Sequence, residues 1–330
     1  MKNFTCIGDV PRPADLLEEA LTLKANPRKF DHVGKHRTLV LLFFNPSLRT
    51  RISTEKAGFN LGMQVITMNA QQGWNIEFEE GAVMDGDKAE HIREAAAVIS
   101  QYATLIGVRT FPGLTDRELD YADHVLGKFL QYARVPVISL ESAIRHPLQS
   151  LADWMTIEEH KPVTRPKVVL SWAPHPRPLP QAVANSFLEW MKHAGVDLVL
   201  THPPGYELAE EFSSGIRVET DQDKALEGAD FVYAKNWSSY RDYGKVLYSD
   251  PSWMITAEKL RRTNQAKFMH CLPVRRNVVV ADEVLDSPGS LVLQQAHNRT
   301  YAAQAVLKLL LEKIGDDTGD YRFARNHLFD

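Results

Sequence analysis

Short apolar runs rich in β-branched residues alternate with longer helical patterns, and this alternation restricts the possible folds more than any other feature. Continuous apolar runs indicate strands covered on both faces, and strand–helix alternation indicates parallel sheets. The predicted strands are Thr38–Phe44, Gln64–Met68, Thr104–Arg109, Val135–Ser139, Lys167–Trp172, Val196–Thr201, Phe231–Ala234, Ala266–His270 and Ser290–Leu293. The predicted helices include Leu48–Gly62, Lys88–Tyr102, Ser150–His160, Gln181–Gly195 and a closing helix, Asn298–Ile314. The sequence therefore predicts an α/β protein with two doubly wound parallel sheets.

Composition excludes several classes of function. The 330 residues carry a net charge of -4, so no overall basic field favours nucleic acid. The two cysteines, Cys6 and Cys271, cannot form a disulfide framework and lack metal-ligand spacing. The N-terminus is polar, and no apolar run reaches the roughly 18 residues of a membrane span. We expect a cytoplasmic protein without metal or membrane anchor.

Polar residues follow the first predicted strand, where active sites of parallel sheets lie. Asn45 suits an N-cap and Pro46 the first helical position, so a helix N-terminus with its positive dipole end is expected there. The hydroxyl and guanidinium donors that follow lie in the segment Ser47, Leu48, Arg49, Thr50 and Arg51. Such donors match a phosphate, so a site for a multiply charged oxyanion is predicted. The alternative is a helix start with solvated arginines.

Other strand ends carry polar groups too. Arg109 ends the third predicted strand, and His146 opens a helix in which Gln149 offers an amide that can both donate and accept. The segment His270–Asn277 follows the eighth strand, and Arg299 is expected at the start of the closing helix. No glycine-rich nucleotide motif follows a strand.

Three of these segments together resemble the aspartate/ornithine carbamoyltransferase (transcarbamylase) family. They are S-L-R-T-R at Ser47, H-P-L-Q at His146 and H-C-L-P at His270, in the family's order and spacing, and the resemblance covers about residues 1–314. It implies a carbamoyl-phosphate-binding domain (1–147), an acylornithine-binding domain (148–298), a closing helix (299–314) and a tail (315–330). It also implies homotrimers whose active sites lie between the domains and use a neighbouring subunit.

The resemblance implies a role for each motif residue. Ser47, Leu48, Arg49 and Thr50, with Arg51, would hold the phosphate of carbamoyl phosphate. Arg109 and His146, with Thr50, would polarise its carbonyl. Gln149 and the carbonyls near Cys271 and Leu272 would hold the carbamoyl NH2, and Arg299 would close on them. The catalytic set is thus Arg109, His146 and Cys271, with no cofactor.

Cys271 invites a nucleophilic interpretation because His270 is adjacent. Neighbouring residues on a strand point to opposite faces, which places the two side chains poorly as a pair. We interpret Cys271 as a positioner of the attacking amine, and a small buried thiol is the alternative.

The identity of the acceptor amine is predicted from the differences between this sequence and the sequences of the ornithine enzymes. Their S-M-G segment is absent from Gly228–Tyr240, and Lys235 stands near its place; a lysine repels a free α-ammonium. The proline-rich Trp172–Val183 resembles the loop of the N-acylornithine branch, which implies a knot. Asn69–Ala95 resembles the loop that reaches a neighbour's site, where Trp74 would contact phosphate and Lys88–Glu90 would face the acyl group.

Three further residues bear on the acyl group. Ala89 matches neither branch but lacks the glutamate of the acetyl branch, whereas Arg177 and Val279 favour the succinyl branch. Glu141, Arg177, Lys235, Ala89, Cys271 and Arg275 are expected to line the acylornithine side. The expected reaction carbamoylates the δ-amine of N-succinylornithine in arginine biosynthesis. N-acetylornithine is the alternative acceptor, and a binding protein without catalysis is the alternative from another class.

Overall fold

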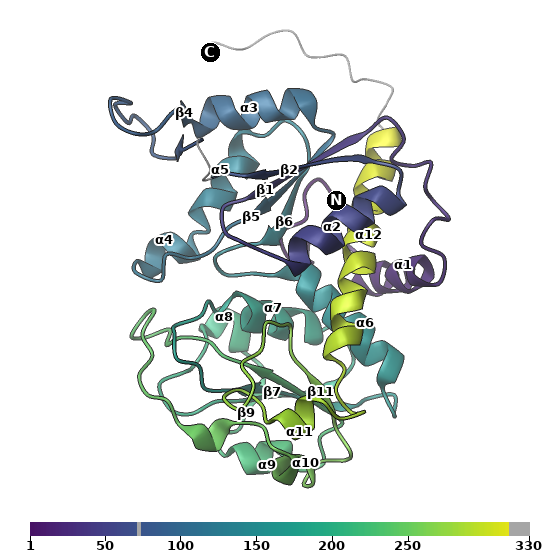
Figure 1. The fold of residues 1–330 in the computed structure, drawn as a ribbon, viewed down its shortest axis with the longest axis vertical. Helices are drawn as coiled ribbons and strands as arrows, with labels where there is room; N and C mark the ends of the chain where they lie inside the picture. Colours follow the sequence, from purple (N-terminus) through teal and green to yellow (C-terminus); the bar gives the residue numbers. More distant parts are fainter. Residues whose placement is uncertain (71–73, 317–330) are drawn as a thin grey trace.

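Two parallel sheets form the framework of the protein in a computed structural model, which describes residues 1–70 and 74–316 (Figure 1). The first has the order β2 (Gln64–Asn69), β1 (Thr38–Phe43), β5 (Leu105–Arg109), β6 (Val137–Glu141). The second has the order β11 (Lys267–Met269), β10 (Phe231–Lys235), β7 (Lys167–Trp172), β8 (Asp197–Thr201), β9 (Arg217–Val218). A short parallel pair, β3 (Ile76–Glu77) and β4 (Glu90–His91), lies apart from both sheets. The predicted α/β class with two parallel sheets is confirmed.

Helices cover both faces of each sheet. Those accompanying the first sheet are α1 (Pro13–Ala25), α2 (Arg49–Asn60), α3 (Ile92–Tyr102), α4 (Arg117–Tyr121) and α5 (His124–Tyr132). Those accompanying the second sheet are α7 (Ala182–Met191), α8 (Glu210–Ser213), α9 (Gln222–Leu226), α10 (Ala257–Leu260) and α11 (Asp282–Leu285). Two 3-10 turns, η1 (Ile7–Asp9) and η2 (Pro251–Trp253), complete these parts. In Figure 1, α7 lies on the side of the second sheet that faces the first sheet, and α9 and α10 lie on its far side.

Two further helices connect the parts. α6 (Pro147–His160) leads from the first sheet to the second, and α12 (Val292–Asp316) packs against α6, α2 and α1. Figure 1 shows α12, in yellow, returning past α6 toward the first sheet. Side chains on α12 can therefore reach the ends of α2 and α6 together.

Strand β1 illustrates why the apolar pattern is continuous. Leu39, Leu41 and Phe43 belong to the core beneath α1, α2 and α12, whereas Val40 and Leu42 belong to the core beneath α3 and α5. Because successive side chains of a strand point to opposite faces, a strand buried on both faces needs apolar residues at every position.

Several sequence predictions about secondary-structure elements were wrong. Ser290–Leu293 is not a strand: Ser290 makes one isolated bridge to Phe268, and α12 already begins at Val292. Arg299 consequently lies well inside α12 and not at its start. The helix predicted from Lys88 begins at Ile92, after β4. β9 was not predicted.

The start of α2 was also predicted too early. The helix begins at Arg49 with Leu48 as N-cap, so neither Asn45 nor Pro46 has its predicted capping role. Their carbonyl oxygens accept hydrogen bonds from Arg109 Nη1 at 3.1 and 2.9 Å, which holds this segment outside the helix. The free N–H groups of the helix start therefore lie within the Arg49–Arg51 motif itself.

Candidate active site

The carboxyl ends of the first sheet's central strands bring two charged residues together. The register aligns Phe43 with Arg109 and Arg109 with Glu141. Arg109 donates from Nε to Glu141 Oε2 at 3.1 Å, and its Nη2 lies 2.9 Å from the same oxygen. Both side chains are buried. The predicted pairing of strand ends therefore produces a buried ion pair, which also anchors the loop leading into α2.

Burial raises the pKa of Glu141, and the charges of Arg109 and Arg299 oppose that rise. Desolvation penalises an isolated carboxylate, whereas two guanidinium groups stabilise its charged form. Glu141 therefore fixes the guanidinium plane of Arg109. Three of the five N–H groups of Arg109 bond to Glu141 or to the loop carbonyls through Nε and Nη1, and a fourth, on Nη2, faces Glu141.

Arg299 is the centre of the candidate site. Its Nη2 donates to Thr50 Oγ1 at 2.6 Å, and its Nη1 donates to Gln149 Oε1 at 2.8 Å. The same Nη2 lies 3.4 Å from His146 Nε2. Burial lowers the pKa of Arg299 to about 10, so the side chain stays charged at neutral pH. One guanidinium therefore joins α2, α6 and α12.

His146 caps α6, with Pro147 as the first helical residue, as the sequence predicted. Burial lowers the pKa of the imidazole well below its usual value, and the charges of Arg299 and Arg109 lower it further. Its backbone N–H donates to Ser186 Oγ at 2.8 Å, which fixes the start of the helix. The neutral ring can polarise a carbonyl without bringing a further positive charge into the site.

Arg49 and its neighbours on the α2 segment differ in orientation. Burial lowers the pKa of Arg49, and the groups that act on it next are Cys271, Arg109 and Glu141, so Arg49 belongs to this site. Arg51 instead donates to Asn69 Oδ1 at the end of β2, with its guanidinium carbon 4.8 Å from the Phe43 ring centre.

The first residues of this segment are more accessible. Ser47 is partly exposed, and the Leu48 side chain is 66% exposed. Leu48 is therefore placed to bind an anion at the helix start through its backbone and not through its side chain.

The second sheet contributes Lys235 and the H-C-L-P turn. Lys235 ends β10 in a buried position and donates to Asn236 O at 3.0 Å. Burial raises the pKa of the Cys271 thiol, which opposes its ionisation, while Lys235 acts in the other direction. His270 lies beyond β11, and its Nδ1 accepts from Leu272 N at 2.9 Å.

The alternation argument against a Cys–His pair was therefore misapplied, because neither His270 nor Cys271 lies on a strand. The conclusion keeps a different support. Burial lowers the pKa of His270 well below its usual value, and its Nδ1 is engaged within the turn. Nucleophilic cysteines have depressed thiol pKa values, and that of Cys271 is raised.

Arg177 and Arg275 lie outside the buried cluster. Both are exposed, and both contact His175: Arg275 Nε donates to His175 Nε2 at 3.1 Å, and His175 Nδ1 lies 2.9 Å from Arg177 O. Burial lowers the pKa of His175, and Arg275, Lys235 and Arg177 are the charges that lower it further. These side chains form a cationic group on the Lys235 side.

Trp74 and Ala89 lie in the β3–β4 segment, which Figure 1 shows projecting from the first sheet near α3. Trp74 Nε1 donates to Glu90 Oε2 at 2.8 Å, and Ala89 N donates to Asn75 O at 2.9 Å. Ala89 is exposed. Within the described part of the chain, neither residue hydrogen-bonds to the Arg299 cluster.

Sequence reasoning missed two buried residues that hold the predicted ones. Asp153 Oδ1 accepts from Gln149 Nε2 at 2.8 Å and from Gln295 Nε2 at 2.6 Å. The spacing of Gln149 and Asp153, one helical turn apart on α6, was a usable signal. Gln295 had none, because its partners are distant in sequence.

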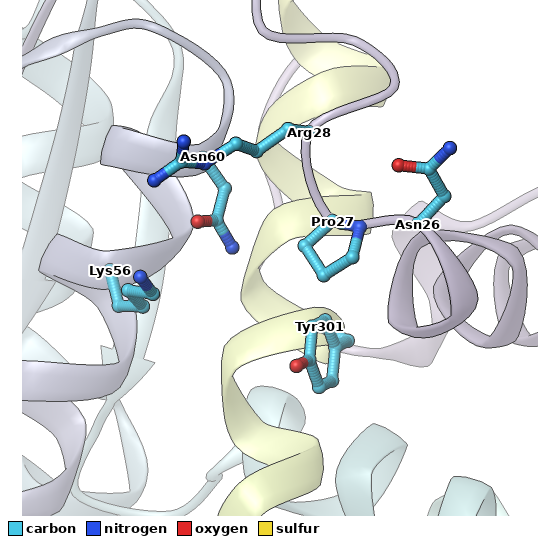
Figure 2. Close-up of a pocket in the computed structure, with 6 residues that line it drawn as sticks. All are labelled: Asn26, Pro27, Arg28, Lys56, Asn60 and Tyr301. Carbon is cyan, nitrogen blue, oxygen red and sulfur yellow. The ribbon is translucent and has the colours of Figure 1, made fainter.

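One cavity of about 420 Å³ lies elsewhere, between α2, α12 and the loop after α1. Figure 2 shows its lining residues, Asn26, Pro27, Arg28, Lys56, Asn60 and Tyr301. None of them belongs to the predicted site. In residues 1–70 and 74–316, no cluster of three or more His, Cys, Asp or Glu side chains could hold a metal ion. The same residues include no helix long and apolar enough to cross a membrane.

Family models match both halves of the chain. The model for the carbamoyl-P binding domain of aspartate/ornithine carbamoyltransferase matches residues 2–159. The model for the Asp/Orn binding domain of the same family matches residues 180–310.

Similar proteins of known name cover nearly the whole chain. N-succinylornithine carbamoyltransferase of Bacteroides thetaiotaomicron is 52% identical over 317 residues, which are 95% of this chain and 100% of that protein. N-acetylornithine carbamoyltransferase of Xanthomonas axonopodis pv. citri is 38% identical over 322 residues, covering 91% of this chain and 93% of that protein.

Solved structures agree with these matches. A mutant of N-acetyl-L-ornithine transcarbamylase complexed with carbamyl phosphate and N-succinyl-L-norvaline has a TM-score of 0.87 and 39% identity. The alignment covers 94% of this chain and 100% of that chain. Acetylornithine transcarbamylase complexed with acetylcitrulline also gives a TM-score of 0.87 at 39% identity, covering 94% of this chain and 99% of that one.

Proposed function

Because the chain belongs to the aspartate/ornithine carbamoyltransferase family, we propose that it carbamoylates the δ-amine of N-succinylornithine. Carbamoyl phosphate is the donor, and N-succinylcitrulline and phosphate are the products, formed in the cytoplasm in arginine biosynthesis. The observation that carries the proposal is the guanidinium of Arg299 bonded at once to Thr50 and Gln149 beside His146. The closely similar enzyme named for N-succinylornithine supports the choice of acceptor.

The phosphate of the donor would bind at the start of α2. Free backbone N–H groups and the helix dipole favour an anion there, and Arg49 adds a charged donor. Ser47, Leu48 and Thr50 complete the segment. As the C–O bond to phosphate breaks, these groups stabilise the charge that the leaving group gains.

The carbonyl oxygen of the donor gains charge when the amine attacks. Thr50 Oγ accepts from Arg299, so its own hydroxyl proton is free to donate. The neutral His146 and Arg109 add donors on the same side. Glu141 already holds Arg109, and Arg299, itself bonded to Gln149, already holds Thr50, so little reorganisation accompanies the attack.

The donor's NH2 group would be held by Gln149 Oε1 and the backbone carbonyls at Cys271 and Leu272. This orients the carbamoyl carbon toward the acceptor amine. The amine forms the new N–C bond, the C–O bond breaks with its electron pair leaving on phosphate, and the proton that the amine loses passes to the departing phosphate. Cys271 would position the amine as a neutral thiol and would form no bond to carbon.

The acyl group and the α-carboxylate would bind on the side of the second sheet. Lys235 is buried, and its Nζ donates to the backbone oxygen of Asn236, so its charge suits the substrate's α-carboxylate. Glu141 lies nearby and acts on it electrostatically. Arg177 and Arg275 suit the outer carboxylate of a succinyl group, which an acetyl group lacks.

We also propose a homotrimer in which Trp74 and Ala89 serve a neighbouring site. Apolar side chains are exposed at the N-cap of α2, on α2 itself and on the edge strand β2: Leu48 66%, Ile52 56%, Ile66 47% and Met68 39%. Exposed apolar patches at an unpaired sheet edge are typical of interfaces. The β3–β4 segment follows β2 along the chain and projects beside α3 (Figure 1).

We propose two domains, 1–147 and 148–298, followed by a closing helix, 299–314. This closing helix is part of α12, which links back to the first domain. The predicted knot stays a prediction. The proline-rich segment is tied to the segment after β10, since Ser238 N donates to Leu179 O and Gln181 Nε2 donates to Ser238 O. The proposed tail, 315–330, lies almost wholly outside the described residues.

Incubation with carbamoyl phosphate and N-succinylornithine tests the proposed reaction. We expect N-succinylcitrulline, identified by mass spectrometry, in amounts equal to the phosphate released. Phosphate without ureido product would indicate hydrolysis. Tight binding of carbamoyl phosphate without turnover by any ornithine derivative would support a binding protein instead.

A further inference from the structure

Asp153 is a buried carboxylate that takes no part in the proposed carbamoyl transfer. It lies on α6, one turn after Gln149, and its side chain is inaccessible to solvent. Its Oδ1 accepts two hydrogen bonds, from Gln149 Nε2 at 2.8 Å and from Gln295 Nε2 at 2.6 Å. A buried carboxyl group is costly unless its hydrogen bonds are made, so its place beside the site calls for a role.

The two hydrogen bonds determine which way each amide points. Asp153 Oδ1 can only accept, so the NH2 end of each glutamine must face it. The oxygen ends then face away. Gln149 Oε1 accepts from Arg299 Nη1 at 2.8 Å, and Gln295 Oε1 accepts from His270 N at 3.0 Å.

Resting on the proposed function, we propose that Asp153 is a positioning residue for the carbamoyl group. It orients the Gln149 amide so that its oxygen faces the donor's NH2. Through Gln295, it also fixes the His270–Pro273 turn, whose carbonyls would hold the same NH2 group. One carboxylate thus aligns both sets of acceptors for one substrate group.

The arrangement holds in either protonation state. Burial raises the pKa of Asp153 to about 7, and the hydrogen bonds from Gln149 and Gln295 oppose the rise, as does the charge of Arg299. Tyr233 of β10 also lowers the pKa of Asp153, and the charge of Asp153 in turn raises the pKa of the Cys271 thiol. A proton on Oδ2 leaves Oδ1 free to accept both glutamine NH2 groups.

Two variants separate orientation from simple packing. Asp153→Asn keeps an acceptor oxygen at Oδ1, whereas Asp153→Ala removes it. Losing a buried acceptor that orients a binding group should weaken carbamoyl phosphate binding about 30-fold in the alanine variant, and less than about threefold in the asparagine variant. Titration calorimetry with carbamoyl phosphate measures both in the absence of acceptor.

Thr156→Val is the matched control. Thr156 is equally buried on α6, donates to Ala152 O and accepts from Asn298 Nδ2 of α12 at 3.0 Å, so it also joins α6 to α12. It lies one turn further from Gln149. We expect a lower melting temperature with unchanged carbamoyl phosphate affinity. An equal loss of affinity in this variant would overturn the proposal.

A double-mutant cycle decides whether Asp153 acts through Gln149. In a Gln149→Ala background, Asp153→Ala should cost at most a few-fold further affinity, because the amide it orients is gone. Independent, additive losses would overturn the proposal. If Asp153→Ala does not fold, Gln295→Leu serves in its place, since it removes the acceptor of His270 N; unaltered affinity in that variant would equally contradict the proposal.

The outcome is distinguishable from failure of the proposed reaction. A wild-type protein that binds carbamoyl phosphate but forms no ureido product refutes the proposed reaction, while the calorimetric comparison still decides the role of Asp153. A wild-type protein that does not bind carbamoyl phosphate refutes both.

Discussion

The donor side and the acyl side of the candidate site are built in contrasting ways. On the proposed donor side, Thr50, His146 and Gln149 are buried, and all three side chains contact the buried Arg299 of the same chain. On the proposed acyl side, Arg177 and Arg275 are exposed; the Arg275 side chain bonds to His175, and the backbone oxygen of Arg177 contacts the same imidazole. Preorganised buried donors suit the chemistry, which is common to the family, whereas exposed side chains are easily changed to suit a different acyl group.

This contrast predicts that substitutions on the donor side reduce turnover with every acceptor, whereas substitutions on the acyl side change the preference among acceptors.

The largest effect is expected for Arg299→Ala. It leaves Thr50, Gln149 and His146 without their shared partner, and should lower kcat/KM about a thousandfold for any acceptor. Steady-state kinetics with succinylornithine and acetylornithine measures it. A loss confined to one acceptor would break the comparison.

The buried donor side should also make stability depend on pH through Asp153. Burial raises its pKa to about 7, so between about pH 4 and 7 the folded state binds a proton that the unfolded state has lost. The stabilising contribution of this group is therefore greatest at low pH and is lost as the pH rises through 7. Relative to Asp153→Asn, the wild type should lose about 1.4 kcal/mol of unfolding free energy per pH unit in that range.

Urea unfolding at pH 5, 6, 7 and 8 checks this prediction, with Asp153→Asn as the reference at each pH. Parallel stability curves for the two proteins would show that Asp153 does not change its proton affinity on folding.

Ala89→Glu tests the acyl side, in the segment proposed to reach a neighbouring subunit. A carboxylate there would repel the outer carboxylate of a succinyl group, by about 1–2 kcal/mol in partly wet surroundings. The ratio of kcat/KM for succinylornithine over acetylornithine should fall about five- to thirtyfold, with carbamoyl phosphate affinity nearly unchanged. Ala89→Gln, similar in size and uncharged, is the control. An unaltered ratio for Ala89→Glu would mean that the segment does not contact the acyl group.

Arg177→Ala should have the smallest effect. Its side chain is exposed, so its attraction to the succinyl carboxylate is screened and worth little. We expect KM for succinylornithine to rise about three- to fivefold, with KM for acetylornithine unchanged, and the difference to shrink in high salt. A large loss of kcat with both acceptors would place Arg177 in the donor side and contradict the division.

Local motifs made the donor side predictable. Ser47–Arg51 and His146–Gln149 each follow a strand of the first sheet, and parallel strands bring their carboxyl ends to one edge. The predicted start of α2 was wrong because the carbonyl oxygens of Asn45 and Pro46 accept hydrogen bonds from Arg109, which is distant in sequence. Local capping preferences cannot anticipate a distant donor.

The apolar run Ser290–Leu293 failed for another reason. A short apolar run does not distinguish a strand from the first turn of a buried helix. The structure continues it into α12, and this longer helix is what carries Gln295 and Arg299 to α6. Arg299 contacts Thr50, Gln149 and His146 because α12 packs in this way. The sequence could therefore identify Arg299 as a site residue but could not identify its partners.

The most direct test of the account is kcat/KM for ornithine, N-acetylornithine and N-succinylornithine, measured side by side at saturating carbamoyl phosphate. We predict that kcat/KM for N-succinylornithine exceeds that for N-acetylornithine at least about tenfold, the combined selectivity expected if Arg177 and Arg275 each contribute about a three- to fivefold preference. We also predict negligible turnover of ornithine, whose free α-ammonium would face the charge of Lys235. Equal or greater kcat/KM for N-acetylornithine would contradict the proposed acceptor, and efficient turnover of ornithine would contradict the role of Lys235.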